Sequence, residues 1–237
     1  MNIGGATVAK QAIELATNVS SAFVNDTDSD GIVGLAFPVL NMVKPNAQST
    51  FFENIMATLE QPLFTVDLDL DGSGTYEFGV IDPTKFMGEL TFVPIDTTSG
   101  FWMCSSPTYS IGGVSKTPSN PSPAVLDTGT SLMLMDPAVV EDYYSQVSGS
   151  QVSVDAHGWI FPCSATLPDF SVSIGGSYTA DVPGSSLTYA SISSETCFGG
   201  LQSNGGSGLQ IFGDVLLQHH FTVFHGETAM VGMAKKA

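Results

Sequence analysis

The sequence predicts a mainly β protein that two helical segments interrupt. Apolar and polar residues alternate along most of the chain, and a period of two is typical of strands. Stretches rich in glycine, serine and proline separate these runs, as expected of turns. Of the 237 residues, 43% are hydrophobic and 12% are charged, so the chain can bury a large core and disorder is excluded.

The clearest strand pair is a hairpin that starts at Phe64. Apolar residues alternate with Thr65 and three aspartates up to Asp71, and Gly72 and Gly74 then turn the chain into a second alternating run. We expect one face of this hairpin to be buried and the aspartate-bearing face to lie in solvent. Three further runs with strand periodicity are Glu89–Ile95, Phe170–Ile174 and His220–Phe224.

The first helical segment begins at Thr50. Glu53 follows three residues later, which is the spacing of a capping box. Apolar residues then recur at helical spacing as far as Leu59. The pattern predicts a helix with one buried stripe.

The second helical segment begins after Asp136. This aspartate is placed to be the N-cap, because Pro137 occupies the first helical position. Apolar residues recur at helical spacing, and Gly149 is the expected stop. Both helices are expected to pack against the core.

The charge balance bears on partners and location. The chain has 23 acidic residues against 6 basic ones, a net charge of −17, so we expect no nucleic-acid partner and no binding to anionic membranes. No apolar run reaches the roughly 18 residues that span a bilayer, and Met1 is not followed by the pattern of a secretory signal. We therefore expect a soluble chain, intracellular if Met1 is the natural start and secreted if an upstream segment is removed.

Two aspartate runs resemble the first half of a calcium loop. They begin at Asp26 and Asp67, but the twelfth position is Phe37 in one and Phe78 in the other. A calcium loop needs a bidentate glutamate there. The histidines also lack metal-ligand spacing, so we expect no metal and no cofactor.

Three cysteines are present. An odd number leaves at least one thiol free, and the count does not say which two residues pair.

The informative segment runs from Ala124 to Leu132 and contains Asp-Thr-Gly. An apolar strand brings Asp127 into a turn of small residues. Gly129 allows close approach of the backbone, and the Thr130 hydroxyl can hydrogen-bond the carboxylate. Asp127 is the candidate catalytic residue, and Thr128, Gly129 and Thr130 are the candidate supporting residues.

This segment resembles the active-site motif of pepsin-like aspartic proteases, and the rest of the chain agrees with that family in order. Asp30–Phe37 is similar to an apolar-apolar-Gly segment of the first lobe, and Ile211–Val215 to its counterpart in the second lobe, which crosses behind the catalytic loop. The segments Phe78–Asp82, Val93–Trp102 and Leu167–Phe170 resemble fungal, penicillopepsin-like members.

The resemblance implies a bilobal acid-protease fold with an incomplete N-terminal lobe and a complete C-terminal lobe. Residues 1–80 would be the remnant of the first lobe and residues 81–237 the second. It also implies that Cys163 and Cys197 form a disulfide, that Cys104 stays free, and that Ile211 supports the Asp127 loop from behind.

The family uses two catalytic aspartates, one in each lobe, whereas Asp-Thr-Gly occurs once here. The resemblance implies an N-terminally truncated chain that lacks the first aspartate and the flap over the substrate. Two carboxylates about 3 Å apart share a proton, so that one acts as base and the other as acid. A lone Asp127 with an ordinary pKa near 3.9 loses this arrangement.

Three functions remain open from the sequence. The preferred one is a cleft that binds an apolar small molecule, with Asp127 as a single general acid or base in non-hydrolytic, isomerase- or cyclase-like chemistry. The second is an aspartic endopeptidase completed by dimerisation or by a missing N-terminal segment. The third is a non-catalytic protein that binds a ligand or peptide. We also expect a homodimer or a partner chain to cover the apolar face that an incomplete first lobe leaves open.

Overall fold

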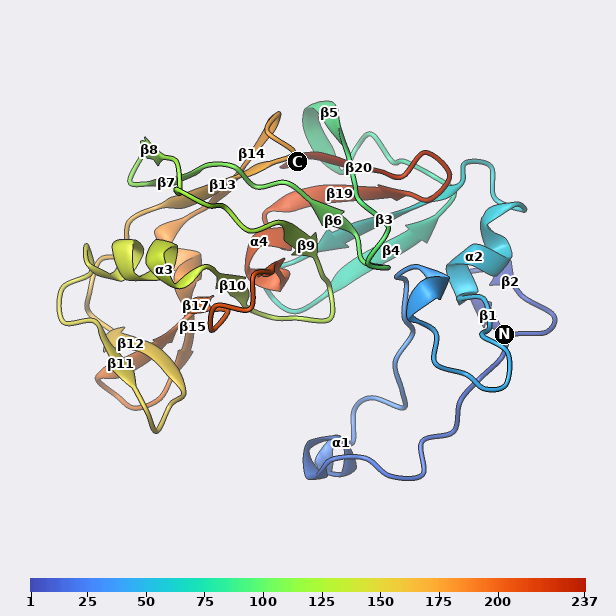
Figure 1. The fold of residues 1–237 in the computed structure, drawn as a ribbon, viewed down its shortest axis with the longest axis horizontal. Coiled ribbons are helices and arrows are strands. Elements are labelled where there is room, and N and C mark those ends of the chain that lie inside the picture. The colour runs from blue at the N-terminus through green and yellow to red at the C-terminus, as the bar shows by residue number, and fades with distance from the viewer.

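The computed structural model describes residues 1–237 except for the side chain of Ala22, and it confirms a mainly β fold. Figure 1 shows sheets through the centre and left of the molecule, while the N-terminal residues extend away from them on the right. The helices and 3-10 turns are α1 (Ser21–Asn25), η1 (Pro38–Leu40), α2 (Phe51–Met56), α3 (Pro137–Tyr144), η2 (Gly184–Leu187) and α4 (Asp214–Leu217).

One five-stranded sheet joins distant parts of the chain. Its order is β4-β3-β19-β20-β5, and all neighbours are antiparallel. The predicted hairpin is confirmed as β3 and β4. The expected solvent face is wrong for Thr65, which is 1% exposed. Thr65 lies opposite Val223 of β19, on a face of the sheet that a hydrophobic cluster covers. The bounds are β3 Leu63–Leu68, β4 Gly74–Phe78, β5 Phe86–Pro94, β19 His220–His225 and β20 Met230–Lys236.

A second five-stranded sheet, in the order β17-β10-β18-β9-β6, carries the Asp-Thr-Gly segment. Strands β9 and β18 run parallel, with Val125 opposite Ile211. Neighbouring parallel strands end at the same edge of a sheet, so the residues that follow β9 and β18 lie close together. The bounds are β6 Met103–Cys104, β9 Ala124–Leu126, β10 Met133–Met135, β17 Leu201–Ser203 and β18 Gln210–Phe212.

Three smaller sheets complete the fold. Their orders are β14-β13-β7-β8, β11-β12-β16-β15 and the pair β1-β2. The bounds are β1 Asn2–Ile3, β2 Ala6–Thr7, β7 Tyr109–Ile111, β8 Val114–Lys116, β11 Gln151–Ser153, β12 Gly158–Pro162, β13 Phe170–Ile174, β14 Tyr178–Val182, β15 Thr188–Ser191 and β16 Thr196–Gly199.

The first predicted helix is confirmed as α2. The Thr50 hydroxyl oxygen accepts a hydrogen bond from the Glu53 backbone N–H at 3.2 Å, which satisfies one of the unpaired donors at the helix start. The helix ends at Met56, so Leu59 lies in the turn beyond it.

The second predicted helix is confirmed as α3, with Asp136 at the N-cap position and Pro137 as its first residue, but its predicted end is wrong. The Asp136 side chain makes no cap hydrogen bond. Its two oxygens accept instead from the Ser122 backbone N–H and the Asn204 side-chain amide, both at 3.1 Å. The helix ends at Tyr144 rather than Gly149, because residues 145–150 form turns that bond back over three or four residues.

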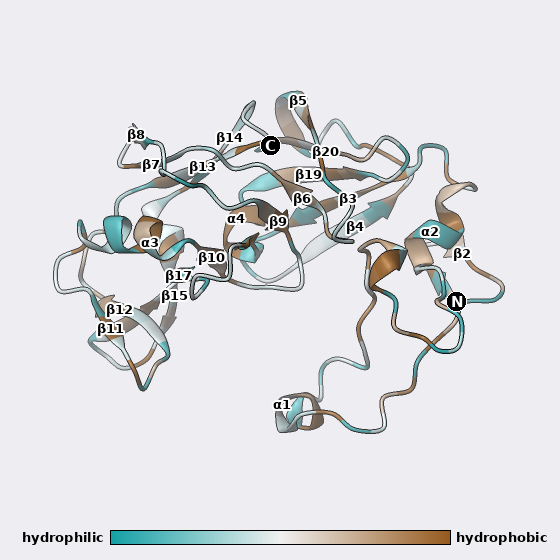
Figure 2. Ribbon diagram, viewed as in Figure 1, coloured by the Kyte–Doolittle hydropathy of each residue, from teal (hydrophilic) through white to brown (hydrophobic). Residues whose placement is uncertain are grey.

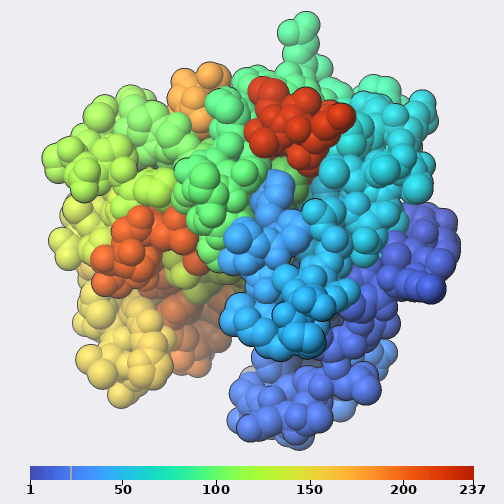
Figure 3. All heavy atoms as spheres, turned by 45° about the vertical axis from the view of Figure 1, so that its right-hand side comes forward, coloured from blue at the N-terminus to red at the C-terminus, as the bar shows by residue number. Residues whose placement is uncertain are grey.

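The segment before α2 is poorly buried. Among its described side chains only Val8 is buried, whereas Leu15 is 87% and Ile32 81% exposed. Hydrophobic residues lie along this segment outside the sheets (Figure 2). In Figure 3 a notch separates the blue N-terminal residues from the yellow residues of the β11–β12 hairpin. The division into lobes at residue 80 stays a prediction.

One part of the N-terminal segment is attached to the core. The Trp102 indole N–H donates to the Leu35 carbonyl at 2.9 Å, and its ring centroid lies 4.6 Å from that of Phe37. The Phe37 N–H also donates to the Gly100 carbonyl at 3.0 Å. These contacts hold residues 35–37 against residues 100–102.

Candidate active site

The Asp127 carboxylate is held through both of its oxygens. The Gly129 backbone N–H donates to Oδ1 at 2.9 Å, and the Thr130 hydroxyl donates to Oδ2 at 2.7 Å. The hydrogen bond expected from Thr130 is therefore present. Two donors fix the orientation of a carboxylate better than one. The carboxylate enters the turn directly after the buried strand β9.

The crossing segment supports this loop from behind. Ile211 lies opposite Val125 in the parallel pair of β18 and β9. The Asp127 backbone N–H donates to the Phe212 carbonyl at 3.1 Å. A Cβ atom on Gly213 would lie 1.9 Å from the Thr130 carbonyl oxygen, so only glycine fits at this contact.

A second acidic residue, Asp214, belongs to the same region. Its backbone N–H donates to the Thr130 carbonyl at 2.9 Å. Burial raises the pKa of Asp214 to about 6, and the negative charge of Asp127 adds to that shift. Its Oδ1 atom is buried with no hydrogen-bond partner among the described residues. The structure therefore brings two carboxyl groups into electrostatic contact within one chain.

Tyr76 of β4 also reaches this region. Burial raises the pKa of its phenol, and the charges of Asp214 and Asp127 act in the same direction, while the neighbouring Thr128 hydroxyl opposes the shift. Thr128 therefore faces a tyrosine of the other five-stranded sheet. The candidate site consists of the loop 127–130 with Tyr76 and Asp214 beside it.

The sequence did not assign a role to Tyr76 or Asp214. Tyr76 carried only a strand signal, and its contact with the loop depends on how two sheets pack. Asp214 had a usable signal, because it directly follows the glycine of the segment that crosses behind Asp127.

The cysteines are arranged as the resemblance implied. Cys163 and Cys197 form a disulfide, and Cys104 is free and buried. Burial raises the pKa of the Cys104 thiol to about 11. Because the thiolate is the reactive form, this residue is a poor nucleophile at neutral pH.

Within the described part of the chain, no three histidine, cysteine or acidic side chains are grouped so that they could hold a metal ion. No helix there is long and apolar enough to cross a membrane.

Comparison with known proteins decides the family. The model of the family "Eukaryotic aspartyl protease" matches residues 1–236. The chain belongs to this family. It is 46% identical to aspergillopepsin-1 of Aspergillus fumigatus and 47% identical to penicillopepsin-1 of Talaromyces stipitatus, which it covers to 60% of their lengths. Penicillopepsin-1 of Penicillium janthinellum is 44% identical and is covered to 72%.

These alignments include 99% or 100% of this chain. The family match therefore covers both five-stranded sheets and the Asp127 loop. The chain spans about 60% of the length of the first two relatives.

Proposed function

We propose that this chain takes part in peptide-bond hydrolysis and that Asp127 supplies one of the two carboxylates of an aspartic endopeptidase. The observation that carries the proposal is the double hydrogen bond to the Asp127 carboxylate from Gly129 and Thr130. These two hydrogen bonds orient the carboxyl group at the end of a buried strand. A fixed orientation of this kind is what proton transfer to or from a bound water requires. Similarity along nearly the whole chain to named fungal pepsins supports it.

The second carboxylate of the proposed site comes from another polypeptide segment. A second copy of the chain could bring its own Asp127, or residues outside these 237 could supply the acid. Asp214 is less suited, because its Oδ1 atom is buried. In the completed pair the two carboxyls share one proton, so that one takes a proton from water while the other donates to the peptide carbonyl.

The non-hydrolytic chemistry that the sequence analysis preferred gains no support from the relatives, whose family is named for protein cleavage. We therefore place peptide hydrolysis first. A binding protein without catalysis is the remaining alternative, and the experiment below separates it from the enzyme.

The experiment measures hydrolysis of unfolded casein at about pH 3 to 5, where a carboxyl pair can hold one proton. The chain is assayed alone at rising concentration, and again with the part of P. janthinellum penicillopepsin-1 that the alignment leaves uncovered. If the hydrolysis rate rises with the square of the chain's concentration, a second copy of the chain supplies the second carboxylate. If hydrolysis occurs only when the penicillopepsin segment is added, residues outside these 237 supply it. Pepstatin should block either activity.

Asp127→Asn should abolish hydrolysis in whichever assay is active, because the amide cannot share a proton with the second acid. Asp96→Asn is the matched control, since Asp96 is exposed, lies at an isolated β-bridge and also accepts hydrogen bonds from a backbone N–H and a threonine hydroxyl. Hydrolysis that survives Asp127→Asn, or no hydrolysis in either assay, would reject the proposal.

A further inference from the structure

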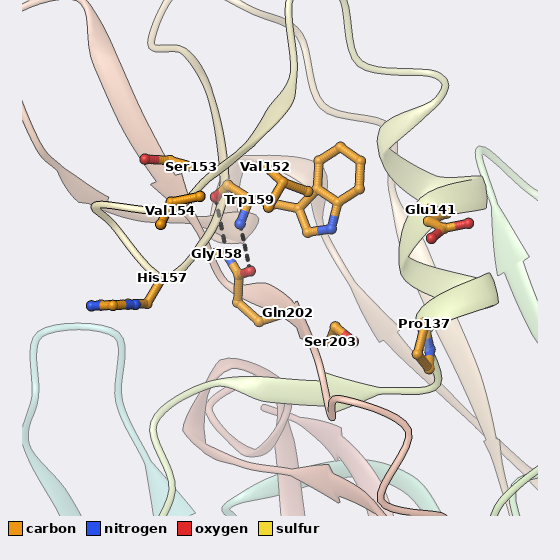
Figure 4. A pocket seen from close by; sticks show the side chains of 10 residues that line it. All are labelled: Pro137, Glu141, Val152, Ser153, Val154, His157, Gly158, Trp159, Gln202 and Ser203. Carbon is orange, nitrogen blue, oxygen red and sulfur yellow. Dashed lines mark hydrogen bonds between the residues drawn. The ribbon is translucent and has the colours of Figure 1, made fainter.

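A pocket of about 420 Å³ lies between α3 and the β11–β12 hairpin (Figure 4). Glu141 of α3 faces it from one side, and Val152 and Trp159 of the hairpin face it from the other. None of the residues 127–131 is part of its lining. Its chemistry is therefore separate from the proposed hydrolysis.

Trp159 is fixed in place by a buried glutamine. Gln202, which is 5% exposed, accepts from the Trp159 backbone N–H at 2.7 Å and donates to the Trp159 carbonyl at 3.1 Å. The indole ring stacks on Tyr144 with ring centroids 4.7 Å apart and planes inclined by 8°. The Tyr144 hydroxyl in turn donates to the Leu201 carbonyl at 2.8 Å. Because the Trp159 indole is already held in one orientation, it loses little conformational entropy when a ligand binds.

The pocket also presents groups that have no partner within the described structure. The Trp159 indole N–H makes no hydrogen bond there, and the exposed Glu141 carboxylate makes no ion pair. Asp142 next to it is already paired with Lys116 at 2.7 Å. The free carboxylate therefore offers an acceptor for a cation, and the indole offers a hydrogen-bond donor.

An apolar surface borders these polar groups. Val152 lies opposite Trp159 in the antiparallel pair, so both side chains lie on one face of the hairpin. Val152 is 61% exposed and Val154 82% exposed. Because these two valines are exposed beside the Trp159 ring, they can pack against apolar residues that flank a bound side chain in the ligand.

We propose that this pocket binds an arginine side chain carried by an extended peptide segment. The guanidinium pairs with Glu141 and lies against the indole of Trp159, a combination that a planar cation makes better than an ammonium. A peptide carbonyl accepts from the indole N–H. The net charge of −17 favours a basic partner.

The test uses the peptide acetyl-Val-Arg-Val-amide and its neutral counterpart with citrulline in place of arginine. The chain has two tryptophans, so its two indole N–H resonances can be followed by NMR. The variant Trp159→Phe lacks one of them and so identifies the Trp159 resonance. We expect the arginine peptide to shift the Trp159 resonance in a saturable way at about millimolar concentration. The citrulline peptide should shift it far less, and Trp102 should not respond.

The decisive variant is Glu141→Gln, which should weaken the arginine peptide about tenfold. Glu89→Gln removes the same charge at an exposed position on β5 and should leave binding unchanged. Equal binding of the two peptides, equal weakening by the two variants, or no shift of Trp159 would overturn the proposal. The titration is also done with Asp127→Asn, where it should be unchanged, so that failure of the proposed hydrolysis does not affect the result.

Discussion

The charge of Asp127 acts on the carboxyl group of Asp214. Burial is the larger cause that raises the pKa of Asp214 to about 6, and the Asp127 carboxylate adds to it. The two residues are also tied through Thr130, which donates to the Asp127 carboxylate and accepts from the Asp214 backbone N–H. A change at Asp127 should therefore be visible at Asp214 even where no substrate is present.

Asp127→Asn should lower the pKa of Asp214 while leaving it above the ordinary value of an aspartate. The amide removes the repelling charge but not the burial, which is the larger cause. Carboxyl carbon NMR titration of the wild type and the variant measures the shift. Asp155→Asn, at an exposed turn position, should leave the titration unchanged. An identical pKa of Asp214 in all three proteins would contradict the coupling.

His220 should make the fold less stable in acid. The ring is 1% exposed, and its nitrogens lie 2.8 Å from the Tyr178 hydroxyl and 3.1 Å from the Asp181 carbonyl. Its pKa is lowered to about 4, mainly by burial; Asp181 opposes this shift, and the charges of His219 and Lys235 act in the same direction as burial. An unfolded histidine titrates near pH 6.5. Between these values the unfolded chain binds more protons, so stability falls as the pH drops, by up to about 3 kcal/mol.

The matched variants for this effect are His220→Gln and His157→Gln. Glutamine cannot take up the proton, so His220→Gln should flatten the loss of unfolding free energy between about pH 6.5 and pH 4. His157 is exposed, and its replacement should leave the slope as it is. Urea unfolding at several pH values measures both. A slope that persists in His220→Gln would assign the acid sensitivity to other groups.

Removal of the disulfide should cost about 4 kcal/mol of unfolding free energy. Cys163 and Cys197 are 34 residues apart, and a crosslink over a loop of that length restricts the unfolded chain by roughly this amount. The double variant Cys163→Ala with Cys197→Ala should match the wild type treated with reductant in urea unfolding. Cys104→Ala should retain its response to reductant. Equal stability of oxidised and reduced wild type would contradict the prediction.

Local patterns predicted the elements well where short-range chemistry decides them. The hairpin of β3 and β4 follows from alternation and two glycines, and the start of α2 follows from the Thr50 hydroxyl and Glu53. The Cys163–Cys197 pair came from family resemblance, because three cysteines leave the pairing open.

Tertiary contacts decided the details that the sequence did not predict. Asp136 has the right type and position for an N-cap, yet its oxygens bond Ser122 and Asn204, which is 68 residues away. Thr65 looked like a solvent-facing residue and is buried, because it shares a face of the sheet with Val223 and a hydrophobic cluster covers that face. The coupling of Asp127 with Asp214 likewise depends on a parallel pairing between Val125 and Ile211, which are 86 residues apart in the sequence.

Gly213→Ala should destabilise the fold and displace the Asp127 loop. The new Cβ atom would lie 1.9 Å from the Thr130 carbonyl oxygen and 2.5 Å from the Leu132 carbonyl oxygen. Both are backbone atoms, so the loop rather than a flexible side chain must move, and we expect a loss of about 3 kcal/mol or more. Gly31→Ala is the matched control, because no atom lies within 4 Å of its new Cβ. Urea unfolding compares the stabilities, and backbone NMR shifts of residues 127–130 report the loop. Equal stability of the two variants with unchanged loop shifts would show that Gly213 does not set the position of Asp127.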